Sequence, residues 1–190
     1  MDDTEPAWRY LRTQREAVLW KVEGLSERDL RMPRTPTGTN LLGLVKHLAG
    51  CEAEYFGACL GRPWPEPFAF WADDAQDNDD MWATADESPE QVLDTYRRVI
   101  AFADETVAPL ALDTPAHVPW WRTPETTVGV LLVHMAVETA RHLGHLDILR
   151  EQADGSRGLR DGISNLPDGD EQWWSDYVAT LRDLAERSPG

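Results

Sequence analysis

Hydrophobic positions recur at three- and four-residue intervals along most of the chain. This spacing places side chains on one face of a helix. The first segment with this pattern is 5–23, whose apolar positions are Trp8, Leu11, Val18, Leu19 and Val22. The segment is long enough for several turns, so a first helix is predicted there.

The same periodicity predicts three more long helices and one near the C-terminal end. The second helix is expected to be capped by Thr39 or Asn40 and to end near Gly61. The third is expected to start at Asp86 or Ser88, with Pro89 in its first turn. The last two are expected at roughly 125–152 and at about 170–187. No segment alternates apolar and polar residues long enough to predict a strand. We therefore expect an all-α, single-domain protein over 1–190, a four-helix bundle with long crossover connections plus a C-terminal fifth helix.

A polar stripe interrupts the apolar pattern of the fourth helix, in the sequence ETARHLGHLDILRE. His134, Glu138, His142 and His145 follow one another at intervals of four, four and three, which places them on one side of the helix. Eleven residues of helix rise about 16 Å, so one ion cannot bind all four side chains. The stripe is either a polar seam with a structural role or one half of a metal site.

His47 is the candidate partner for this stripe on another helix. It lies on the apolar arc that contains Leu44 and Leu48, so its imidazole is expected to face inward. A core histidine that hydrogen-bonds Glu138 or a backbone carbonyl is the simpler alternative. A buried glutamate without a cation is costly, however, which favours a metal or a protonated histidine. Two histidines and a carboxylate leave one zinc position open, as in catalytic sites, and also suit nickel, iron or manganese.

Charge and composition exclude several functional classes. The formal net charge is −16, and such a surface repels nucleic acid phosphates and anionic lipid. No apolar run is long enough for a membrane span, and MDDTEPAWRY has no features of a signal peptide. Cys51 and Cys59 are about 12 Å apart if they share one helix, too far for a disulfide. These observations predict a cytoplasmic protein without nucleic acid or membrane partners.

The long connector 61–87 contains the acidic run DDAQDNDD. The run lacks the glycine and the glutamate that a calcium loop needs in a consistent register. We therefore expect a solvated acidic loop.

Three stretches together resemble the DinB-like superfamily of metal-binding four-helix proteins: LVKHLAG, ETARHLGHLDILRE and GLRDGISNLPDGDEQWW. The resemblance covers nearly the whole chain. It extends to an actinobacterial subfamily of unknown function that is related to the mycothiol-dependent maleylpyruvate isomerase. The resemblance implies a bundle fold and rules out the activity of the DNA polymerase that shares the name.

The resemblance also implies a site and a chemistry. It makes His47, Glu138 and His142 the ligands of a divalent metal ion, with zinc expected. His145 and His134 would then be catalytic, either orienting a ligand or moving a proton. Relatives with known activity bind a low-molecular-weight thiol. The implied reaction is a mycothiol-type S-transfer to an electrophile or a thiol-assisted isomerisation, in a protein that pairs as a homodimer.

Several roles stay open on the sequence alone. Arg141 pairs with a carboxylate or binds a substrate anion, and Trp120 packs in the core or a lid or lines a pocket mouth. Cys51 is a small buried thiol or approaches the metal. The remaining alternatives for the whole protein are a non-catalytic metal- or small-molecule-binding protein and a metal-free structural or dimerising bundle.

Overall fold

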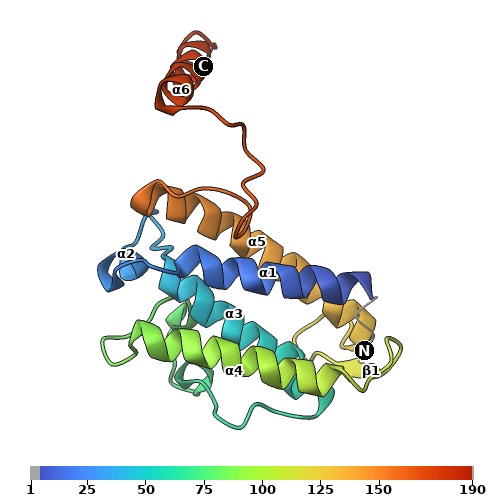
Figure 1. The fold of residues 1–190 in the computed structure, drawn as a ribbon. Helices are drawn as coiled ribbons and strands as arrows, with labels where there is room; N and C mark the ends of the chain where they lie inside the picture. Colours follow the sequence, from blue (N-terminus) through green and yellow to red (C-terminus); the bar gives the residue numbers. More distant parts are fainter. Residues whose placement is uncertain (1–4, 190) are drawn as a thin grey trace.

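The computed structural model describes residues 5–189 and is built almost entirely from helices (Figure 1). Four long helices lie side by side in a bundle, with a short helix α2 (Glu27–Arg31) at one end. The four are α1 (Pro6–Val22), α3 (Leu41–Tyr55), α4 (Pro89–Val107) and α5 (Val128–Asp154). The prediction of an all-α four-helix bundle is confirmed.

The predicted caps begin two of these helices. The Asn40 side chain accepts a hydrogen bond from the backbone N–H of Gly43 at 2.8 Å and starts α3. Ser88 and Gln91 form a reciprocal capping box at the start of α4. Local sequence signals therefore fix where the two central helices begin.

The long connector between α3 and α4 is anchored to α3 rather than looping freely. It contains three single 3₁₀ turns, η1 (Ala58–Leu60), η2 (Ala69–Trp71) and η3 (Asp79–Met81). A Cβ atom on Gly43 would lie 1.8 Å from the carbonyl oxygen of Met81, so only glycine allows η3 to approach α3 this closely. This approach places the end of the acidic run against the bundle.

The structure adds two short strands to the predicted helices. The strands β1 (Pro115–His117) and β2 (Glu125–Thr127) pair as an antiparallel hairpin, with Ala116 opposite Thr126. Strands of three residues are too short for an alternating pattern to be recognised. The hairpin also moves the start of the last bundle helix from the predicted position 125 to Val128.

Two large hydrophobic clusters fill most of the bundle, beside a small third one around Trp64 and Phe102. One lies toward α2 and includes Val18, Leu44, Tyr96 and Leu146, and the other lies toward the hairpin and includes Leu11, Phe56, Val107 and Leu131. Both large clusters draw residues from several helices, so each packs those helices together. Polar side chains that enter the core need a partner.

The predicted fifth helix forms but stays outside this core. α6 (Glu171–Glu186) stands away from the bundle at the end of an extended segment, and none of its residues is buried. The bundle therefore closes without it. In the part of the chain from 5 to 189, no helix is long and apolar enough to cross a membrane.

Candidate metal centre between α3 and α5

Polar side chains meet along the contact between α3 and α5 at three successive levels, which we call the seam. Each level is one helical turn from the next, and the two helices run in opposite directions. The three pairs, each written with its α3 member first, are His47 with His142, Cys51 with Glu138, and Tyr55 with His134. The structure thus brings the histidine of one helix onto the polar stripe of the other, as the sequence predicted.

The middle of the seam has the spacing of a metal site. The Oε1 atom of Glu138 and the Sγ atom of Cys51 each lie 3.4 Å from Nε2 of His47. One ligand atom from each of these residues lies within 4.8 Å of the other two. Donor atoms bound to one tetrahedral zinc ion lie roughly 3.4 Å apart. The nitrogen, sulfur and oxygen donors therefore fit a divalent transition metal in both chemistry and spacing.

His142, the expected third ligand, lies at the edge of this triad. Its Nε2 is 3.0 Å from Oε1 of Glu138, and its ring centroid is 4.8 Å from that of His47. Burial, and then the neighbouring His47, hold the pKa of His142 below its usual range, against the opposing effect of Glu138. The imidazole is therefore neutral at pH 7 and has a lone pair to offer.

The seam carries negative charge that no cationic side chain balances. Partial burial acts to raise the pKa of Glu138, but the neighbouring His142 and the hydrogen bonds from His47 and His142 hold it below its usual value. Among residues 5–189, Glu138 forms ion pairs only with these two histidines. Burial raises the pKa of the Cys51 thiol strongly, and the Glu138 carboxylate adds to the effect. A divalent cation would reverse this balance and favour the thiolate.

Asp80 is a member of the site that the sequence did not reveal. Its Oδ2 lies 2.6 Å from Nδ1 of His47, on the opposite side of the ring from Glu138. The expectation that the acidic run is entirely solvated is wrong at this residue, because η3 packs on α3 beside Gly43. A carboxylate on the far nitrogen of a ligating histidine fixes its tautomer and orientation. The only sequence signal for this contact is Gly43, which permits the close approach of η3 to α3.

The two histidines predicted to be catalytic lie at opposite ends of the seam. Nδ1 of His145 is 3.3 Å from Nδ1 of His142, on the exposed side. The His134 ring packs against Tyr55 and Trp121, with centroid distances of 4.5 and 5.0 Å. His145 therefore adjoins the metal-binding end, whereas His134 belongs to an aromatic group one turn away.

Trp120 joins that aromatic group and Arg141 does not. The indole N–H groups of Trp120 and Trp121 both donate to the Tyr55 hydroxyl, at 3.2 and 3.3 Å. Arg141 is exposed and forms no ion pair with any residue that the structure describes. Of its two roles, pairing with a carboxylate finds no partner among residues 5–189, and binding of a substrate anion stays a prediction.

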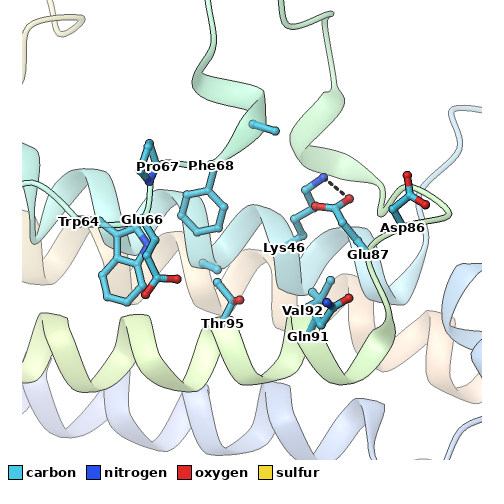
Figure 2. A pocket seen from close by; sticks show the side chains of 12 residues that line it. Lys46, Trp64, Glu66, Pro67, Phe68, Asp86, Glu87, Gln91, Val92 and Thr95 are labelled. Atoms are coloured by element: carbon cyan, nitrogen blue, oxygen red, sulfur yellow. Dashed lines mark hydrogen bonds and ion pairs between the residues drawn. The ribbon is translucent and has the colours of Figure 1, made fainter.

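A separate cavity of about 290 Å³ lies between α3 and α4 (Figure 2). Figure 2 shows Trp64 and Phe68 at one side and the ion pair of Lys46 with Glu87, whose N–O distance is 2.9 Å, at the other. None of the seam residues lines this cavity. The cavity and the seam are thus two distinct features on different faces of α3.

A comparison with protein-family models gives a match over most of the chain. A protein-family model with the description mycothiol-S-transferase matches residues 8–155, which include nearly all of α1 and extend through the end of α5. None of the curated proteins compared with the chain matches it. The matched region contains the whole seam and leaves out α6.

Proposed function

The chain belongs to the mycothiol-S-transferase family, and from this premise we propose that it catalyses a metal-dependent transfer of mycothiol to an electrophile at the seam. The family is one of mycothiol-dependent transferases, and the membership confirms the resemblance to DinB-like bundles. The observation that carries the proposal is the uncompensated triad of His47, Cys51 and Glu138 within the matched region.

In this proposal the ion is held by His47 and Glu138, with His142 and Cys51 as the adjoining donors. The separation of 3.4 Å between donors on two different helices supports the assignment. Asp80 orients the His47 ring by accepting a hydrogen bond from Nδ1–H, which leaves Nε2 free to bind a cation. A divalent ion bound there supplies a Lewis acid that stabilises a thiolate at neutral pH.

The remaining residues act on the organic substrates. The exposed His145 contacts His142 and is placed to accept the proton that the thiol loses. The aromatic group of Tyr55, Trp121 and His134 lies one turn away and offers a wall for the electrophile. Proton acceptance and substrate packing are thus assigned to opposite ends of the seam.

The test is a conjugation assay with mycothiol and monobromobimane, using metal-loaded protein, chelator-treated protein and the variant Glu138→Gln. We expect conjugation above the uncatalysed rate in the loaded protein and at least a tenfold loss in the other two. Full activity in metal-free protein would contradict the proposed mechanism.

The same assay separates the alternatives left open by the sequence. Stoichiometric metal binding without conjugation of any electrophile would indicate a binding protein. An absence of metal binding would indicate a structural seam in which histidines only hydrogen-bond Glu138. The negative charge of the seam favours the metal over this last alternative, because the two flanking imidazoles leave Glu138 without a permanent cation.

A further inference from the structure

Tyr55 forms an unusual hydrogen-bonding arrangement at the third level of the seam. Its hydroxyl oxygen accepts two hydrogen bonds, from the indole N–H groups of Trp120 and Trp121 at 3.2 and 3.3 Å. An indole nitrogen can only donate, so the direction of both bonds is fixed. The two tryptophans are consecutive residues that follow β1, and the hairpin holds them against α3.

The consequence is that the Tyr55 hydroxyl can act only as a donor toward a further group. A phenolic oxygen has two lone pairs and one proton, and here both lone pairs are occupied. No acceptor for the proton lies within hydrogen-bonding distance among residues 5–189. Tyr55 as a whole is only 9% exposed, and a buried donor without a partner is costly, so its proton is available to a group that enters beside the exposed Trp120.

The position of this donor relates it to the metal triad. Tyr55 follows Cys51 by one turn on α3, and its ring packs on His134, which precedes Glu138 by one turn on α5. One turn of helix is a rise of about 5.4 Å. A substrate lying between these two levels would meet a thiolate at the triad with its reacting carbon and direct the oxygen bonded to that carbon toward the third level.

We propose that Tyr55 is a catalytic residue that donates a hydrogen bond to the oxygen of the electrophile on which negative charge develops. The proposal rests on the proposed function and adds the substrate class, namely uncharged electrophiles with an oxygen that becomes anionic, such as epoxides. The sulfur–carbon bond forms as the carbon–oxygen bond of the epoxide breaks, and the electron pair stays on the oxygen. Solvent supplies the proton that completes the alcohol. The proton that the thiol loses goes to the base, His145.

The aromatic surroundings fit this class of substrate. The wall beside the hydroxyl consists of Trp120, Trp121 and the ring of His134, and it carries no formal charge when the histidine is neutral. Flat apolar groups pack well on such rings. Trp120 is 52% exposed, so the wall is open to solvent on one side.

The experiment compares two electrophiles in zinc-loaded protein with mycothiol. Styrene oxide forms an alkoxide when its ring opens, whereas monobromobimane releases bromide, which needs no hydrogen bond. We expect Tyr55→Phe, which keeps the ring packing, to lower kcat/KM for styrene oxide by roughly tenfold to a hundredfold. The loss for monobromobimane, which packs on the same ring but develops no anionic oxygen, should be several-fold smaller, so that the ratio of the two kcat/KM values changes. The matched control is Tyr177→Phe on α6, outside the bundle.

Each outcome decides the matter. Equal losses for both electrophiles would assign Tyr55 a structural role, and no loss for either would leave the hydroxyl without a function, so both overturn the inference. A wild-type protein that conjugates monobromobimane but not styrene oxide would overturn the inference and leave the proposed function standing. A wild-type protein that conjugates neither would remove the proposed function, and the inference with it.

Discussion

Two groups of ionisable side chains reach into the bundle from neighbouring positions of α3, and the negative charge of each group is balanced in a different way. Glu52 is fully buried and binds Arg15 through both of its oxygens, with Nε of Arg15 at 2.7 Å. The same guanidinium also donates to Asp104 at 2.7 Å. One position earlier, Cys51 lies in the middle of the seam, where Glu138 and Asp80 face imidazoles and a thiol. No lysine or arginine between residues 5 and 189 pairs with either carboxylate.

The comparison separates a structural cluster from a functional one. The Arg15 cluster contains its own cation and directs the guanidinium donors at carboxylate oxygens, so it needs nothing from outside. The seam has donors at metal-ligand spacing but depends on an added cation for its charge balance. The same helix therefore holds one polar group that stabilises the fold and one that becomes complete only with a ligand.

The largest effect on stability is expected in the Arg15 cluster. Arg15→Met keeps a side chain that packs on Trp8 and Phe56 but leaves Glu52 buried and unpaired. We expect the free energy of unfolding of the metal-free protein to fall by roughly 3–5 kcal/mol in urea titrations. Replacing Glu52 by Leu in the same protein should recover most of this loss. A loss below about 1 kcal/mol in the single variant would contradict the comparison.

The seam should respond in the opposite way to loss of its carboxylate. Glu138→Gln removes negative charge that no cation balances, so the metal-free protein should stay within about 1 kcal/mol of the wild type. Zinc at a hundred times its dissociation constant should stabilise the wild type by about 2.7 kcal/mol and have no such effect on the variant. Thermal unfolding with and without zinc measures both quantities. A large loss in the metal-free variant would make the seam structural, like the Arg15 cluster.

A smaller effect is expected from Asp80, which acts through His47. Asp80→Asn keeps the shape but weakens the contact to Nδ1 of His47, so zinc affinity should fall roughly tenfold to a hundredfold. Competition with a chromophoric chelator measures this change. The matched control is Asp77→Asn in the same acidic run, which is exposed. Equal effects of the two substitutions would mean that the run acts only through its overall charge.

The smallest effect concerns the ion pair of Lys46 and Glu87 beside the α3–α4 cavity (Figure 2). Partial burial acts to raise the pKa of Glu87, but hydrogen bonds from Lys46 and Thr84 hold it below its usual value. The pair should therefore contribute stability above the pKa that Glu87 has in the unfolded chain. This contribution should disappear as the pH falls through the lower pKa of the folded protein.

The measurement is the difference in unfolding free energy between the wild type and Glu87→Gln from pH 7 to pH 3. At neutral pH the difference should be below about 1 kcal/mol, because the pair is only partly buried. The difference should shrink toward low pH. A constant difference across this range would mean that the charge of Glu87 does not stabilise the fold.

Periodicity and capping were enough to predict the bundle and one side of the site. The intervals between His134, Glu138, His142 and His145 placed them on one helix face, and the apolar arc around His47 turned it inward. Those signals are local, since each depends only on residues within the same helix. The sequence also left open whether Cys51 approaches the metal, and the structure places it in the triad.

The parts that were missed depend on contacts between distant segments. Asp80 reaches His47 only because a connector without periodicity packs on α3 at Gly43. The Tyr55 group needs two tryptophans from beyond α4, held by strands of three residues. Tertiary packing of irregular segments decides such contacts, and no local spacing records it.

The central claim is that a divalent cation binds between α3 and α5, and anomalous scattering from crystals of the zinc-loaded protein tests it most directly. The account predicts one peak at the zinc absorption edge, about 2.0–2.3 Å from Nε2 of His47 and from a carboxylate oxygen of Glu138. A structure of loaded crystals without a peak at the seam, or with the ion held elsewhere on the acidic surface, would contradict it.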